Sequence, residues 1–276
     1  QYSEALTVET SSGGSDLDPL RLKAGAVVEF LDWILPEAPT PGAVGGYLGF
    51  PAEALLTTGE EAAGTLLGLE HHNVGGLLAR GDLCRLRARM AMLSGASLEE
   101  EGHWREESVQ WFVRAVTVAP QNAEALSTAG EGSLEYGKRS LRLYRNIVEA
   151  GQGRVAISVS PPPLHAQGMQ TSAIARLQEA GSLFSRAASA EASDSDVAYN
   201  AACAYALCGD HGSCSRAFRE FCRRLADAGT ATAGRRDAAI RSLREARSDG
   251  DLESVRTTDW FVNLVRRTEA NLRGGI

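Results

Sequence analysis

The chain has 276 residues, enough for one or two domains or for an elongated array of repeats with a sizeable core. Its 28 basic and 35 acidic side chains give a net charge of −7, which disfavours nonspecific binding to nucleic-acid phosphates. No window of about 18 residues is both apolar and uncharged, so we expect no membrane-spanning helix, although docking on a membrane complex stays open.

The first third of the chain is expected to hold an extended tail, residues 1–17, followed by a helical extension, residues 18–78. The tail is rich in serine and glycine, a composition typical of flexible segments. The chain begins with Gln1 rather than methionine, which fits either a processed form or a fragment.

Proline and glycine set the expected helix limits within this extension. A helix should begin at Asp18, because the proline that follows it suits an early helical position. It should stop before Pro36, because a residue that precedes proline avoids the helical region. Residues 36–49 are expected to form a loop and Pro51–Leu69 to form one helix or two, with a further break over residues 71–76.

Residues 79–228 are expected to form about four pairs of antiparallel helices, interrupted at 151–163, where three prolines follow a brief β-branched segment. The second helix of each pair is marked by a small residue, a ring four positions later and an apolar residue three beyond that, which share one helix face. These triplets start at Ser108, Ser140, Ala180 and Cys214, in steps of 32, 40 and 34 residues. The corresponding pairs span 83–118, 123–150, 164–192 and 195–225.

The pair at 195–225 is the clearest, because its two helices differ in side-chain size. The first carries small residues at Ala201, Ala202 and Ala204, which leave room for Phe218 and Phe221 of the second. This pair resembles a tetratricopeptide repeat (TPR), whose unit is about 34 residues long. The resemblance implies an all-α fold, a TPR-like α-solenoid of antiparallel helix pairs with an N-terminal helical extension and C-terminal capping helices.

Residues 229–276 are expected to form those capping helices. Thr232–Ala246 should be one helix, and residues 249–267 are similar to the closing segment that ends many TPR arrays, an acidic turn followed by a short amphipathic helix. A terminal repeat needs such a cap because its hydrophobic face has no neighbour. The residues expected to cover that face are Trp260, Phe261, Leu264 and Val265.

In TPR proteins the first helices of successive repeats line a concave groove that binds peptides, and the resemblance places two sets of residues there. Arg85 and Arg89 are four apart on one helix face and could clamp an acidic partner segment; alternatively, they pair with the glutamates of 99–107. The fourth pair would contribute Tyr199, Asn200, Cys203 and Leu207. Of these, only Asn200 matches the carboxylate clamp of chaperone-binding members, so chaperone tails are not predicted partners.

Other polar clusters have ordinary explanations as well as functional ones. The five cysteines are expected to be reduced thiols in small apolar sites; a Cys208–Cys214 disulfide and a metal site with His211 are the alternatives. His71 and His72 are adjacent and would point in different directions on a helix, which favours a solvated helix end over a metal site. The glutamates of 99–107 are expected to face solvent, with a partner contact as the alternative.

We find no catalytic motif, no metal site and no cofactor-binding motif, and therefore predict a protein that is not an enzyme. The predicted function is a protein–protein interaction scaffold or assembly factor that binds a partner segment in the groove of the array. The alternative is a structural subunit of a large complex, in the cytoplasm or in an organelle after removal of a targeting peptide. An enzyme with its site in the N-terminal third is a third hypothesis, which would need His71 or His72 to line a deep pocket.

Overall fold

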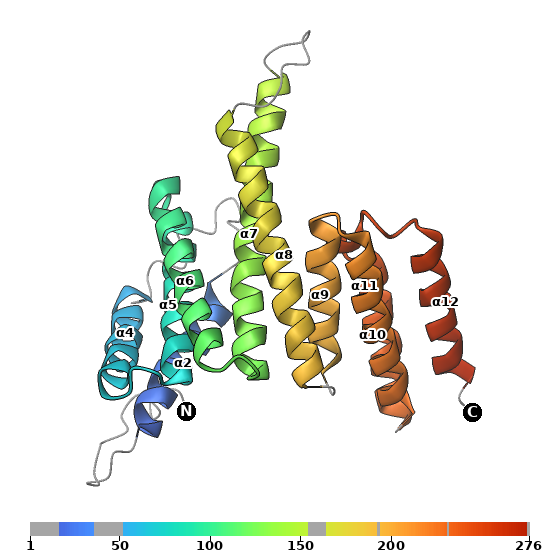
Figure 1. Ribbon diagram of the computed structural model, residues 1–276, viewed down its shortest axis with the longest axis horizontal. Helices are drawn as coiled ribbons and strands as arrows, with labels where there is room; N and C mark the ends of the chain where they lie inside the picture. Colours follow the sequence, from blue (N-terminus) through green and yellow to red (C-terminus); the bar gives the residue numbers. More distant parts are fainter. Residues whose placement is uncertain (1–16, 36–51, 154–163, 192–193, 231, 275–276) are drawn as a thin grey trace. The chain divides into compact units, whose positions relative to one another are not determined.

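The computed structural model describes residues 17–35, 52–153, 164–191, 194–230 and 232–274. Over these ranges the chain is all-helical and its helices pack in adjacent pairs, as Figure 1 shows, which confirms the predicted all-α class. None of the helices described is long and apolar enough to cross a membrane. The chain divides into two compact units, residues 1–120 and 121–276, so the boundary falls inside the predicted array of 79–228.

The described part of the first unit consists of four helices. They are α2 (Asp18–Ile34), α4 (Ala52–Leu69), α5 (Val74–Ser94) and α6 (Leu98–Val118). The predicted start of α2 and its end before Pro36 are confirmed, and Pro51–Leu69 contributes one helix rather than two. The predicted tail, apart from residue 17, and the predicted loop at 36–49 lie outside the described residues.

Side-chain caps explain where α5 and α6 begin. Asn73 accepts a hydrogen bond from the backbone N–H of Gly76, 2.9 Å away, and Ser97 accepts one from Glu100 at 3.1 Å. The predicted break at 71–76 is therefore too long, because the break ends at Asn73 and both glycines lie inside α5. Gly95 closes α5 with a φ of 74°, a left-handed conformation that glycine adopts without strain.

The core of the first unit is built where α5 meets its neighbours. The ring of Phe112 on α6 lies directly over Gly81 of α5, where a Cβ atom would clash with it. On the other side, α2 and α4 pack against α5 and against each other. The buried leucines at these contacts are Leu31, Leu56, Leu83 and Leu86.

The second unit contains the remaining helices, which follow one another in chain order. They are α7 (Ala123–Gly153), α8 (Leu164–Ala190), α9 (Ser195–Leu207), α10 (His211–Gly229), α11 (Ala233–Ser248), the 3₁₀ turn η1 (Gly250–Leu252) and α12 (Asp259–Gly274). Each of α7, α9 and α10 packs against the next helix along the chain, and α8 packs against both α7 and α9. The predicted C-terminal helix, the acidic turn and the closing helix correspond to α11, η1 and α12.

The helix pairs predicted at 123–150 and 164–192 are wrong in one respect: each range is a single helix, and α7 and α8 together make one long pair. A pair was expected over 123–150 because the triplet that starts at Ser140 suggested the second helix of a repeat unit. In the structure glycines of α7 permit close approach of α8, since a Cβ at Gly130 would lie 2.9 Å from the ring of Phe184. Gly137 is similarly covered by Leu177. The β-branched segment after Gly153 lies outside the described residues.

The predicted triplets are buried where two helices meet and less buried elsewhere. Those starting at Ser108, Ala180 and Cys214 are buried throughout. In the triplet that starts at Ser140, by contrast, Tyr144 and Ile147 are only half-buried on the distal part of α7. Three ring-bearing pairs therefore stand where four were predicted, because two expected pairs merge into α7 and α8.

Buried Arg224 of α10 secures the end of α8. Its guanidinium donates to the backbone carbonyls of Ala188 at 2.6 Å, Glu191 at 3.1 Å and Asp194 at 2.6 Å, and to the Glu220 carboxylate at 2.7 Å. The last carbonyls of a helix have no partner within that helix. Arg224 satisfies them and so fixes α10 to the α8–α9 connection.

Candidate functional site

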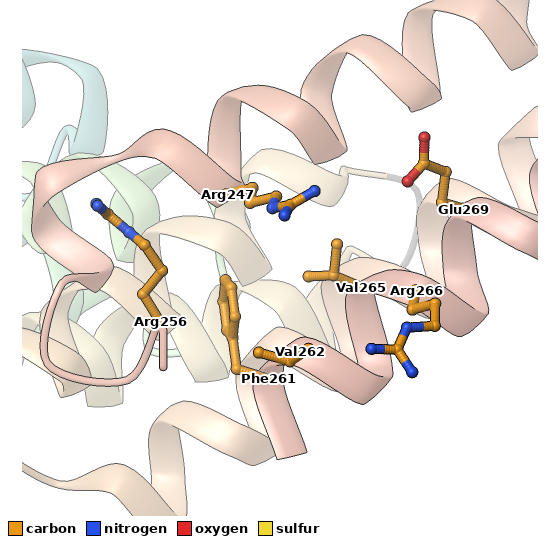
Figure 2. A pocket seen from close by; sticks show the side chains of 7 residues that line it. All are labelled: Arg247, Arg256, Phe261, Val262, Val265, Arg266 and Glu269. Atoms are coloured by element: carbon orange, nitrogen blue, oxygen red, sulfur yellow. The ribbon is translucent and has the colours of Figure 1, made fainter. Parts of the chain in front are cut away.

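A hollow of about 270 Å³ opens between α11 and α12 at the C-terminal end of the second unit (Figure 2). We call it the α11–α12 hollow. Figure 2 shows Arg256 at one end and Arg266 with Glu269 at the other, with Val262 and Val265 between them. The full lining is Arg247, Arg256, Phe261, Val262, Val265, Arg266 and Glu269.

The helical repeat brings most of this lining together. Five of the lining residues lie on α12 at positions 261, 262, 265, 266 and 269, which share one broad helix face. Phe261 anchors that face, because its ring stacks on Phe218 of α10 with centroids 4.7 Å apart. The side chain of Val262 is 40% exposed and supplies the accessible apolar surface of the hollow.

The charges around the hollow are unbalanced. Arg247 and Arg266 are exposed, and neither forms an ion pair with any residue that the structure describes. The single carboxylate, Glu269, is already paired with Arg273 and lies 3.9 Å from Arg244. Its negative charge is therefore already balanced by arginines outside the hollow. The three arginines that line the hollow consequently carry positive charge that no lining carboxylate neutralises.

Arg256 is held in place from one side only. Its Nη2 atom donates to the carbonyls of Ser248, at 3.2 Å, and Asp249, at 2.6 Å, which are orphan acceptors at the end of α11. Its Nε atom is buried and has no hydrogen-bond partner among the described residues. A buried donor without an acceptor costs about 1–3 kcal/mol.

A second polar cluster joins α9 to η1 and α7. Tyr199 donates its hydroxyl to Asp249 at 2.5 Å, and Lys138 of α7 forms an ion pair with Asp251 at 2.7 Å. Burial, with the neighbouring carboxylates, raises the pKa of the Cys203 thiol, and burial, with Cys203 and Asp249 nearby, raises the pKa of Tyr199. Both groups therefore stay protonated near neutral pH.

Three groups of this cluster have the spacing of metal ligands. The Cys203 sulfur and carboxylate oxygens of Asp249 and Asp251 lie within 4.8 Å of one another. A divalent ion there would have to remove the thiol proton and compete with Lys138 for Asp251. In the structure the two carboxylates instead serve to hold the η1 turn, with help from Ser254, whose hydroxyl donates to the Ala206 carbonyl at 3.1 Å.

The structure places the predicted groove arginines against the chain's own α2. Arg89 is 3% exposed and lies 2.7 Å from a carboxylate oxygen of Asp32. Arg85 lies 3.5 Å from the same oxygen and 3.0 Å from Asp82. Arg85 and Arg89 therefore pair with acidic residues of α2 and α5 within the chain, whereas the expected counter-charges were an acidic partner segment or the glutamates of 99–107.

Of the four predicted groove residues on α9, the structure brings two together. Tyr199 and Cys203 meet in the polar cluster, where the η1 turn covers them. Asn200 and Leu207 are both half-buried and take no part in that cluster. Helical spacing predicted that Tyr199 and Cys203 share a face, but not that residues about fifty positions later would occupy it.

The histidine pair and the acidic run of 99–107 lie mostly at the surface, as the non-functional interpretation of each predicted. His71 and His72 are exposed after α4, and His71 Nδ1 lies 2.7 Å from the Leu67 carbonyl. Most of the predicted acidic run is exposed or half-buried, but Glu101 is buried in an ion pair with Arg105 at 2.9 Å.

All five cysteines are free in the structure, so Cys208 and Cys214 are not joined. Burial raises the pKa of Cys84 and Cys214 to about 12 and that of Cys222 to about 11. These three thiols are protonated and packed in the core, whereas Cys208 is half-exposed.

Sequence reasoning did not find the α11–α12 hollow. It predicted that one face of α12 covers the last helix pair, and Phe261 and Val265 are indeed buried there. It did not predict that Val262 and Arg266 of the same helix line a hollow beside α11. Comparison with known proteins adds no further guide, because no protein-family model matches the chain and no curated protein matches it.

Proposed function

We propose that this protein is a non-enzymatic scaffold or assembly factor of the TPR-like class, which holds a segment of a partner protein. The observation that carries the proposal is the α11–α12 hollow, where unmatched arginines surround an exposed apolar side chain beside a stack of helix pairs. Surfaces of this kind bind peptide segments through a few charged and apolar contacts on a rigid frame.

The packing of the helix pairs supports the TPR-like part of the proposal. Phe112 lies over Gly81 in one pair and Phe184 over Gly130 in another, so a ring enters the space that a missing side chain leaves. Phe184 and Phe218 are 34 residues apart, which equals the unit length of the family. Phe112 and Phe184 are 72 apart, which fits a pair lengthened by about one further unit in α7 and α8.

The rigidity of these pairs suits a binding frame. Close-packed helices lose little conformational freedom when a ligand binds, so less of the binding free energy is spent on ordering the protein. The groups predicted for the concave groove are engaged within the chain, by Asp32 for Arg89 and by Asp249 for Tyr199. We therefore place the partner at the hollow rather than at those residues.

The proposal is tested by crosslinking in the native source with identification by mass spectrometry, followed by reconstitution from purified components. We expect one protein to crosslink repeatedly to residues of α11 and α12 and to form a complex of fixed stoichiometry with the purified chain. Light scattering after size-exclusion chromatography measures that stoichiometry. Failure of the purified chain to bind any crosslinked candidate would refute the scaffold function, and crosslinks spread over many fixed neighbours would favour a permanent subunit of a large complex.

A further inference from the structure

We propose that the α11–α12 hollow binds an acidic segment of the partner in which carboxylates flank an apolar side chain. This inference rests on the proposed scaffold function and specifies the chemistry of the segment. Arg247 and Arg266 would hold the flanking carboxylates, and Val262 would contact the apolar side chain between them.

The charge distribution of the chain supports an acidic ligand here. The protein carries a net charge of −7, yet residues 229–276 contain nine arginines and seven carboxylates. The C-terminal helices thus form a basic region on an acidic protein. This local excess of positive charge attracts acidic segments of other proteins and repels basic ones.

The lining favours carboxylates as the charged groups. Arginine presents a planar fork of N–H donors that matches a carboxylate in a bidentate contact. Arg247 and Arg266 are unpaired among the described residues, so a ligand carboxylate does not have to displace an existing partner.

The size and floor of the hollow favour a peptide side chain over a small-molecule cofactor. Its volume of about 270 Å³ falls below the range of roughly 300–1,000 Å³ that is usual for ligand pockets. Val262 is 40% exposed between the arginines, whereas Phe261 and Val265 are nearly covered. The accessible floor therefore accommodates one apolar anchor and not an extended apolar ligand.

Nucleic acid fits these observations less well. Binding to a phosphate backbone requires an extended basic surface, and the accessible centre of this hollow is apolar. The remainder of the chain, with its excess of carboxylates, would repel a polyanion that extends beyond the hollow.

The test uses the full chain and a fluorescein-labelled peptide in which a single leucine lies between runs of glutamate. Fluorescence anisotropy should show saturable binding that weakens with added salt. The double variant Arg247→Glu/Arg266→Glu should bind at least about tenfold more weakly, because each change removes an attraction and adds a repulsion. Val262→Ser should also weaken binding, and a peptide with glutamine in place of glutamate should not bind.

The matched control is Arg241→Glu/Arg267→Glu, which changes the same net charge on the same two helices outside the hollow. This variant should weaken binding much less than Arg247→Glu/Arg266→Glu, because it changes only the screened long-range attraction and removes no contact, and circular dichroism should show all variants folded. Equal weakening by both double variants would overturn the proposal, as would tighter binding of a single-stranded oligonucleotide than of the peptide. If a reconstituted partner bound the Arg247→Glu/Arg266→Glu protein as tightly as the parent, the hollow would be excluded while the scaffold function stood.

Discussion

Replacing Arg224 with methionine should be among the most damaging single changes in the second unit. The side chain is 6% exposed; it joins α10 to the α8–α9 connection through three backbone carbonyls and also bonds to Glu220 on its own helix. Methionine keeps much of the aliphatic stem but removes every donor, so the expected effect isolates the hydrogen bonds from the packing.

The magnitude follows from which acceptors lose their donor. Hydrogen bonds that involve a charged group contribute about 1.5–3 kcal/mol each, and a buried acceptor left unpaired costs about 1–3 kcal/mol. The carbonyl at buried Ala188 suffers the full loss, whereas those at exposed Glu191 and Asp194 can be rehydrated. We therefore expect Arg224→Met to lower the free energy of unfolding by about 3–5 kcal/mol, from the lost charged hydrogen bonds and the buried carbonyl left without a donor.

The measurement is urea unfolding followed by circular dichroism. With a slope of roughly 2 kcal/mol per molar urea, the midpoint should fall by about 2 M with an unchanged slope. The matched control is Arg223→Met, one position earlier, where the arginine is exposed and bonds only to Glu220 and Asp227 among the described residues. Its midpoint should hardly move. A similar fall in both variants, or none in Arg224→Met, would refute the assignment of α8 capping to Arg224.

Three further predictions concern glycine packing, thiol reactivity and pH. Gly130→Ala should lower the free energy of unfolding by about 1–3 kcal/mol, because the new Cβ would meet the Phe184 ring. The control Gly168→Ala has no atom within 4 Å of its new Cβ and should raise the free energy of unfolding by about 0.5–1 kcal/mol. A urea midpoint that rises in both variants would mean that the Phe184 ring moves aside. With a thiol reagent at pH 8, the half-exposed Cys208 should react first and the buried thiols only on unfolding, so a fast phase that survives Cys208→Ser would contradict the assignment. Hydrogen bonds from Arg223 and Arg224 lower the pKa of Glu220 from 4.5 to about 2, so this carboxylate stabilises the fold above pH 4.5 and loses that effect as the pH falls toward 2. The deficit of Glu220→Gln in urea midpoint should therefore shrink over this interval, and a deficit independent of pH would contradict the ion pairing.

Local sequence signals predicted the helical class and most helix ends. Asp18 and Pro36 marked helix limits that the structure reproduces within a few residues. The error at α7 came from assigning one helix pair to each small–ring–apolar triplet, although a triplet can also lie on a single long helix. In the structure Gly130 and Gly137 let α8 approach α7 closely along that helix. Only the position of α8 distinguishes one long helix from a pair of short ones.

The candidate sites depended even more on distant parts of the chain. Helical spacing correctly put Arg85 and Arg89 on one face, but Asp32, which lies more than fifty residues earlier, decides their partner. Likewise, the α11–α12 hollow requires two helices joined by η1, and no single stretch of sequence carries its pattern. Periodicity predicts which residues share a face, whereas tertiary packing determines what that face contacts.

The ion pair between Lys138 and Asp251 has a consequence for synthesis on the ribosome, because the two residues are 113 positions apart. The α7–α8 pair can form early, since its contacts are complete once α8 has left the exit tunnel. Lys138 and Cys203, however, acquire their final surroundings only after the η1 turn has emerged. Co-translational folding of the second unit should therefore end with a late docking step, in which the η1 turn closes over α9.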